Sequence, residues 1–125
     1  MNRNQEEWNQ FGFHYTINDD EKVWIFTGTK SGLKKFYSIL VEYTSDERNN
    51  IVSEHAHYGP DFYLEIMTWP EAQINDHCIC GTFDDLKRLA KTFLEKLMQT
   101  EVGKNFVINS QYTDKAAYSI RVNVV

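Results

Sequence analysis

Long apolar runs, basic clusters and a secretion signal are all missing from this 125-residue sequence. No apolar run approaches the roughly 20 residues that a membrane-spanning helix needs. The first seven residues are polar and contain no apolar signal region, so we expect no secretion. The 18 Asp and Glu residues outnumber the 13 Lys and Arg residues, which gives a formal charge of −5. Because this acidity comes without a basic patch, we expect neither a membrane nor a nucleic acid as partner.

Cysteine is also scarce. The two cysteines, Cys78 and Cys80, are separated by one residue in an extended segment, which is too close for easy disulfide formation. Unpaired thiols are typical of a reducing compartment. Together with the missing secretion signal, they predict a cytoplasmic protein.

Aromatic residues, by contrast, are abundant. They make up 14% of the chain, and hydrophobic residues of all kinds make up 42%. Such a composition argues against disorder and is typical of a globular domain. Domains commonly contain roughly 100–150 residues, and a chain of this length can bury about two thirds of its unfolded surface. We therefore predict a single domain over residues 1–125.

Two short segments resemble each other. Gly28–Phe36 (GTKSGLKKF) aligns without gaps on Gly81–Leu89 (GTFDDLKRL), with identities at Gly, Thr, Leu and the first Lys. The tripeptide Ile-Asn-Asp precedes both copies, starting at Ile17 and at Ile74. Because the repeated pieces occur in the same order, we predict a duplicated fold with halves at about residues 11–69 and 70–125.

Periodic hydropathy predicts both helices and strands. Apolar residues at helical spacing predict one helix over about residues 31–44 and another that begins after Thr82. Thr82 and Asp85 have the spacing of a capping box at the start of the second helix. Aromatic and β-branched runs between turn signals predict strands. These strands lie at residues 11–17, 22–27, 51–58, 62–69, 77–80, 106–112 and 117–124.

The last of these strands alternates apolar and polar residues, as is typical of an antiparallel sheet that is covered on one side only. We therefore predict an α+β fold in which an antiparallel sheet of about six or seven strands carries two helices on one face. The halves would be two pseudo-symmetric repeats, β-β-α-β-β followed by β-α-β-β. The opposite face of the sheet would be open to solvent or to a partner.

The open face is where we expect binding. Leu64 and Ile66 are predicted to point at the helices, so the residues between and beside them point the other way. A three-residue turn at residues 59–61 places His55 opposite Glu65, whereas a two-residue turn would place two glutamates opposite each other. The shorter turn is therefore disfavoured. The predicted patch consists of His55, His57, Tyr63, Glu65, Met67 and Trp69.

This patch has the composition of a protein interface, because aromatic residues and methionine are enriched in interface cores. We predict a small protein-interaction module whose main anchors are Tyr63, Met67, Trp69 and His57. A homodimer with a structural or regulatory role is the alternative. A third arrangement, in which the segment around Trp8 folds across the face, also remains open.

Two pairs of possible metal ligands lie in or near the patch. His55 and His57 would share one face of a strand, and so would Cys78 and Cys80. Two nitrogen and two sulfur donors suit tetrahedral zinc. Strand alternation, however, puts His77 on the face opposite the cysteines, and buried cysteines are more often core residues. We therefore predict no metal and no cofactor, and leave redox sensitivity of the thiols open.

The sequence motifs of serine hydrolases, P-loop proteins, dinucleotide-binding enzymes and zinc proteases are absent. The glycines at 28 and 81 are interpreted as strand ends before helix caps rather than as anion sites. His55 with Glu54 or Glu65 has the chemistry of an acid–base pair. An enzyme centred on His55, His57 and Glu65 is the least favoured alternative, and we expect no catalysis.

Two stretches carry a resemblance to known proteins. Ser53–Pro60 with Tyr63–Trp69, and Gly81-Thr82 with Asp85–Ala90, resemble small uncharacterised bacterial proteins. Some of these are predicted immunity proteins of polymorphic toxin systems. The resemblance covers roughly residues 50–125 and assigns no site residues. It implies a cytoplasmic, non-catalytic protein that neutralises a toxin by binding it.

Overall fold

The computed structural model describes residues 3–125 and contains three helices and eight strands in that range. The helices are α1 (Arg3–Phe11), α2 (Lys30–Ser45) and α3 (Phe83–Gln99). The strands are β1 (Phe13–Asn18), β2 (Val23–Gly28), β3 (His55–Tyr58), β4 (Leu64–Thr68), β5 (Gln73–Ile74), β6 (Ile79–Gly81), β7 (Asn105–Ile108) and β8 (Ser119–Val124). Two short 3-10 turns, η1 (Glu47–Asn49) and η2 (Pro60–Phe62), flank the third strand.

Threonine caps begin both of the predicted helices. Thr29 accepts a hydrogen bond from the backbone N–H of Gly32 at the start of α2. At the start of α3 the Thr82 hydroxyl accepts from the Asp85 N–H, and the Asp85 carboxylate accepts from the Thr82 N–H. This reciprocal pair confirms the predicted capping box. Helix α1 and the two-residue strand β5 were not anticipated from the sequence.

The eight strands form two mixed four-stranded sheets rather than one. The A sheet has the order β1-β2-β8-β7, and the B sheet has the order β3-β4-β6-β5. The central pairs β2–β8 and β4–β6 are parallel, and the outer pairs are antiparallel. The prediction of a single antiparallel sheet with six or seven strands is therefore wrong. A strand with one wet face alternates in the same way whichever direction its neighbour runs, so the pattern in β8 could not reveal a parallel partner.

The A sheet joins the first and last hairpins of the chain, whereas the B sheet joins the two hairpins between them. Both sheets therefore contain an antiparallel, a parallel and an antiparallel pairing in sequence. This shared order of pairings does not demonstrate that the halves are repeats. The duplication stays a prediction from the sequence.

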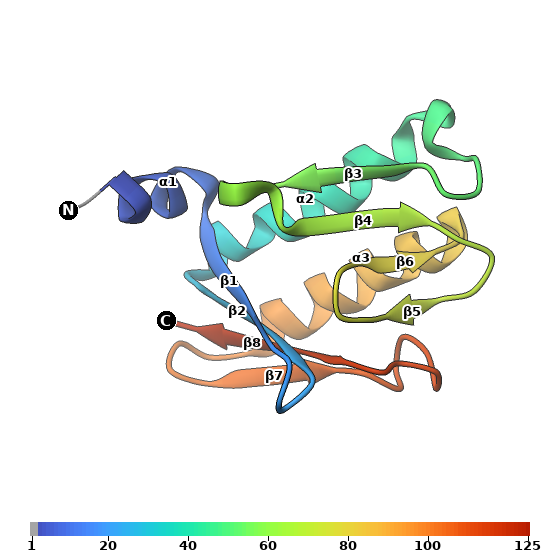
Figure 1. The fold of residues 1–125 in the computed structure, drawn as a ribbon. Helices are drawn as coiled ribbons and strands as arrows, with labels where there is room; N and C mark the ends of the chain where they lie inside the picture. The colour runs from blue at the N-terminus through green and yellow to red at the C-terminus, as the bar shows by residue number, and fades with distance from the viewer. Residues whose placement is uncertain (1–2) are drawn as a thin grey trace.

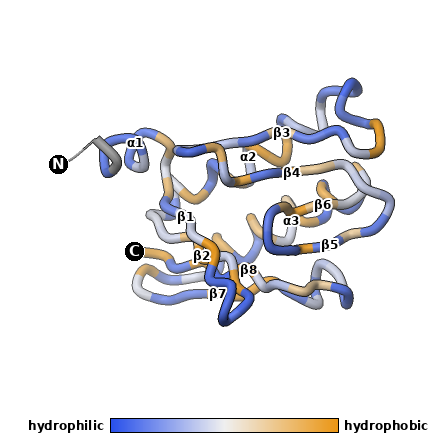
Figure 2. The backbone as a smooth tube through the Cα atoms, in the orientation of Figure 1, coloured by the Kyte–Doolittle hydropathy of each residue, from blue (hydrophilic) through white to orange (hydrophobic). Residues whose placement is uncertain are grey.

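Helices α2 and α3 lie side by side on the same side of the two sheets (Figure 1). Edge-to-face contact between the rings of Phe36 and Phe93, with centroids 4.9 Å apart, links the two helices. Hydrophobic and hydrophilic segments alternate along the helices and most strands, while β3 and most turns are mainly hydrophilic (Figure 2). The core between helices and sheets contains Trp24, Phe26, Leu33, Phe36, Leu64, Ile66, Phe93 and Ile120, all fully buried.

Aromatic side chains connect the two sheets by hydrogen bonds to backbone atoms. The Tyr15 hydroxyl of β1 accepts from the N–H of Leu64 at 2.7 Å and donates to the carbonyl of Tyr58 at 2.9 Å. The indole N–H of Trp24 donates to the Asn75 carbonyl at 2.7 Å. Tyr15 is only 4% exposed, and its burial raises the pKa of the phenol to about 12. These bonds hold the B sheet against the A sheet where no strand ladder continues between them.

Replacing Tyr15 with Phe tests this connection. We expect Tyr15→Phe to lower the free energy of unfolding by about 1–3 kcal/mol, because the buried N–H of Leu64 loses its acceptor. Urea denaturation followed by circular dichroism measures the change. Tyr37→Phe is the control, since the described residues give the Tyr37 hydroxyl no hydrogen bond, and it should stay within about 0.5 kcal/mol of the wild type. Equal stabilities of the two variants would contradict the assignment.

Candidate functional site

The predicted binding patch lies on the β3–β4 hairpin, but the register of this hairpin differs from the prediction. His57 pairs with Glu65 and His55 pairs with Met67. Five residues, 59–63, connect the strands instead of three. Pro60–Phe62 form the η2 turn, so the chain reaches β4 only at Leu64. The register is thus shifted by two residues. A shift of two leaves every side chain on its predicted face, since strand side chains alternate with a period of two.

The patch residues occupy the outer face of the B sheet, which is the face turned away from the helices. Leu64 and Ile66 point inward and are fully buried, as predicted. Glu65 and Met67 are half-buried on the outer face beside the exposed histidines of β3. Tyr63 precedes β4 and Trp69 follows it, so these two aromatic residues flank the strand pair.

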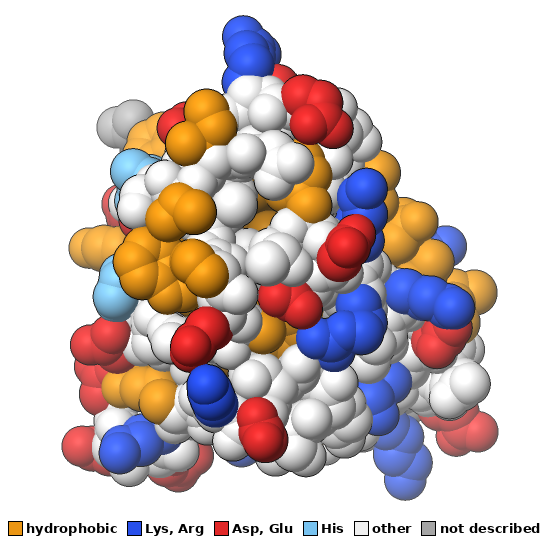
Figure 3. Space-filling model, turned by 90° about the vertical axis from the view of Figure 1, so that its right-hand side faces the viewer, with side chains coloured by type: hydrophobic (Ala, Val, Ile, Leu, Met, Phe, Trp, Pro, Cys, Tyr) orange, Lys and Arg blue, Asp and Glu red, His pale blue; other side chains and the backbone are white. Residues whose placement is uncertain are grey.

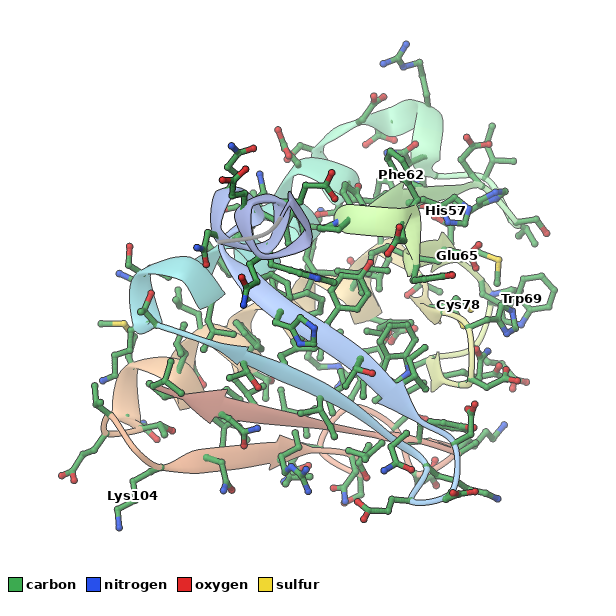
Figure 4. All side chains as sticks on the ribbon, turned by 60° about the vertical axis from the view of Figure 1, so that its left-hand side comes forward. His57, Phe62, Glu65, Trp69, Cys78 and Lys104 are labelled. Atoms are coloured by element: carbon green, nitrogen blue, oxygen red, sulfur yellow. The ribbon has the colours of Figure 1, made fainter. Side chains whose placement is uncertain are left out.

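The side-chain view shows how these groups lie. His57, Glu65, Cys78 and Trp69 lie near one another on one side of the B sheet, and Phe62 lies at the end of the same group (Figure 4). Lys104 lies at the far end of the molecule. In the space-filling view, hydrophobic side chains gather beside histidines along the left edge, others lie along the right edge, and acidic and basic side chains are spread over this face (Figure 3).

Hydrogen bonds to backbone carbonyls orient both imidazoles of β3. His55 Nδ1 lies 3.1 Å from the Ser53 oxygen, and His57 Nδ1 lies 3.0 Å from the Phe62 oxygen. A carbonyl oxygen only accepts, so Nδ1 carries the hydrogen in both rings. His57 Nε2 then faces Glu65 Oε1 at 3.2 Å. The two imidazole rings stand edge to face, with centroids 5.2 Å apart.

Both cysteines are fully buried and unpaired. A hydrogen bond with Cys80, together with burial, raises the pKa of the Cys78 thiol. At neutral pH Cys78 is therefore a protonated thiol with low nucleophilicity. The complete burial of both side chains accords with the interpretation of the cysteines as core residues.

His77 lies closer to the cysteines than strand alternation suggested. A ring nitrogen of His77, Cys78 Sγ and a carboxylate oxygen of Glu65 lie within 4.8 Å of one another. Strand β6 begins only at Ile79, so alternation does not apply to His77. Its hydrogen bond to the Asp76 carboxylate, 2.9 Å long, raises the pKa of the His77 imidazole.

The ligand set considered from the sequence combined both β3 histidines with both cysteines. Among the described residues, the structure brings together different groups. A ring nitrogen from each of His55 and His57 and an oxygen of Glu65 lie within 4.8 Å of one another, and Glu65 also belongs to the group with His77 and Cys78. Cys80 belongs to neither group.

Sequence reasoning missed Phe62. This side chain is 68% exposed, and its neighbour Tyr63 is 67% exposed. Asp61 and Phe62 both adopt the left-handed backbone conformation, with φ of 62° and 56°. Turn positions usually hold Gly, Asn or Asp. Two aromatic residues directly after Pro-Asp are therefore unusual, and this feature of the sequence could have identified Phe62 as a candidate binding residue. A pocket of about 600 Å³ lies between this loop and α1, lined in part by Phe11 and Phe62.

The segment around Trp8 does not cover the patch. The Trp8 ring packs against His14 and Tyr15 of β1, with centroid distances of 4.5 and 4.8 Å. Trp8 also lines a small pocket with Tyr63, so this segment reaches one end of the patch. His55, His57 and Tyr63 nevertheless stay exposed, so the segment does not fold across the patch as the third arrangement required.

Comparisons with protein-family models, with curated proteins and with solved structures found no match. Within residues 3–125, no helix combines the length and the apolar character needed to cross a membrane.

The strained, exposed position of Phe62 predicts that this residue is dispensable for stability. A left-handed non-glycine residue costs roughly 1–3 kcal/mol. We expect Phe62→Gly to leave the free energy of unfolding within about 1 kcal/mol of the wild type, because relief of strain offsets the added chain entropy. Leu64→Ala, two residues away and fully buried, should lower it by about 2–5 kcal/mol. Urea denaturation compares the variants, and a loss above 2 kcal/mol in Phe62→Gly would show that Phe62 stabilises the fold.

Proposed function

We propose that this chain is a non-catalytic protein-binding module that docks a protein partner on the outer face of the B sheet. The observation that carries this proposal is the pair Phe62 and Tyr63. Two consecutive aromatic side chains are about two-thirds exposed, on a backbone that is left-handed at Phe62. Exposed aromatic residues on strained backbone add nothing evident to the fold, and such features cluster at binding sites.

The arrangement along β4 supports a docking surface. From Tyr63 to Trp69 the chain spans about 20 Å, at roughly 3.3 Å per strand residue. Aromatic rings thus stand at both ends of the row, with Met67, His57 and Glu65 between them. A standard interface buries about 800 Å² on each partner, and a few central aromatic anchors supply most of its energy. A row of this length suits the centre of such an interface.

The resemblance to predicted immunity proteins supports a toxin domain as the partner, and a bacterial cytoplasmic setting belongs to the same proposal. The formal charge of −5 favours a partner whose docking surface is basic. An acidic inhibitor that covers a basic toxin surface would gain both association rate and specificity from this complementarity.

Site-specific photo-crosslinking in the host cell tests the proposal. A photoreactive amino acid replaces Met67 on the proposed surface, and in a control chain it replaces the exposed Lys104 at the far end of the molecule (Figure 4). We expect a discrete product with another protein from position 67, and none from position 104. Excess unlabelled chain should compete the product away, because docking is saturable.

The purified partner then allows titration. Trp69→Ser should weaken binding by at least about 2 kcal/mol, roughly 30-fold in Kd. Val102→Ser is the matched control, since Val102 is an exposed apolar residue outside the proposed surface, and its Kd should be unchanged. A crosslinked product of two copies of this chain would replace the proposal with the homodimer alternative. No product from position 67, or equal products from both positions, would contradict a docking surface on the B sheet.

A further inference from the structure

The contact between His57 and Glu65 needs a proton or a metal ion between its two atoms. His57 Nδ1 uses its hydrogen on the Phe62 carbonyl, so Nε2 of the neutral ring presents a lone pair. That lone pair faces Glu65 Oε1 at 3.2 Å, and an ionised carboxylate is also only an acceptor. Two acceptors at this distance are stabilised only when a proton, carried by the imidazole or by the carboxyl group, or a metal ion lies between them.

Burial makes this requirement stronger for Glu65. Its side chain is 15% exposed, against 43% for His57. The one polar contact that the described residues give its carboxylate is with His57. An ionised carboxylate that is largely removed from water needs a cation or several hydrogen-bond donors.

The position of His55 favours a metal ion over a proton between His57 and Glu65. A ring nitrogen of His55 lies within 4.8 Å of both the His57 nitrogen and the Glu65 oxygen. A proton bridges two atoms, whereas three ligand atoms that converge on one point are what a metal ion uses. The Nδ1–H groups of both histidines are held by backbone carbonyls, which is how proteins orient histidine ligands.

We propose that His55, His57 and Glu65 bind one divalent cation of the zinc class on the outer face of the B sheet. Two imidazoles and a carboxylate suit zinc, cobalt(II) or nickel(II), whereas magnesium and calcium select oxygen ligands. Zinc–ligand bonds of about 2.0–2.1 Å in a tetrahedron put ligand atoms about 3.3 Å apart. The 3.2 Å between His57 and Glu65 already matches that separation.

The fold supplies this geometry from two neighbouring strands. His55 and His57 share a face of β3 because they are two residues apart, and Glu65 of β4 stands directly opposite His57. Three protein ligands leave the fourth position to water or to a group from another molecule. The site lies within the proposed docking surface, but binding of the metal alone does not depend on a protein partner.

Titration of the purified full chain with zinc chloride in a calorimeter tests the site. We expect one equivalent to bind with a Kd of about 1 µM or tighter. Glu65→Gln and His57→Ala should each weaken binding by at least about 100-fold, because even outer-shell partners of metal ligands cost 10–100-fold. His14→Ala is the matched control: His14 lies on β1 against Trp8, and its loss should leave Kd and stoichiometry unchanged.

Cys78→Ser separates this site from the neighbouring group of Glu65, His77 and Cys78. We expect its zinc affinity to stay within about threefold of the wild type, and the cobalt(II) complex of the wild type to show no thiolate charge-transfer absorption. Circular dichroism confirms that each variant is folded. Absence of stoichiometric zinc binding by the wild type, or unchanged affinity in Glu65→Gln and His57→Ala, would overturn the proposal. So would a loss of affinity in Cys78→Ser together with a thiolate band.

Discussion

The Tyr15 hydroxyl determines where the β3–β4 hairpin lies on the rest of the fold. It bonds the carbonyl of Tyr58 and the N–H of Leu64, the two residues that pair at the closed end of the hairpin. The ring also packs against Gly59, where an added Cβ would come within 2.9 Å of a Tyr15 carbon and where φ is +79°. One side chain of the A sheet thus holds both ends of the connecting loop of the B sheet.

The hold of Tyr15 on the β3–β4 loop also affects where the residues of the candidate site lie. The five residues of the loop reverse the chain between these two held ends, with Asp61 and Phe62 in the left-handed region and Phe62 exposed to solvent. The same loop length sets His57 opposite Glu65. The Phe62 carbonyl then orients the His57 ring. The exposed aromatic pair and the orientation of His57 toward Glu65 therefore both depend on the conformation of this loop.

Local features of this fold could be predicted from the sequence, and non-local ones could not. The capping box at Thr82 and the inward direction of Leu64 and Ile66 depend on residues a few positions apart, so the pattern of the chain predicts them. The register of the hairpin depends on Tyr15, which lies 49 residues before Leu64. The division into two sheets depends on pairing between the first and last hairpins. Neither the hairpin register nor the division into two sheets is visible in the nearby sequence. The position of His77 could not be predicted either, because it depends on β6 beginning only at Ile79.

Glu65 belongs both to the proposed docking surface and to the proposed metal site. Its charge therefore links the two proposals. Without a metal, the Glu65 carboxyl group and its contact with His57 lie at the centre of the proposed docking surface, between Tyr63 and Trp69. A divalent cation bound by His55, His57 and Glu65 makes the charge at this position more positive. Charges at the centre of an interface are desolvated on docking, so their sign governs which partner surfaces are tolerated. A basic partner surface suits the metal-free face, whereas a partner that supplies a carboxylate or imidazole to the fourth ligand position suits the metal-bound face. The chemistry of the partner and the metal state of the chain therefore constrain each other.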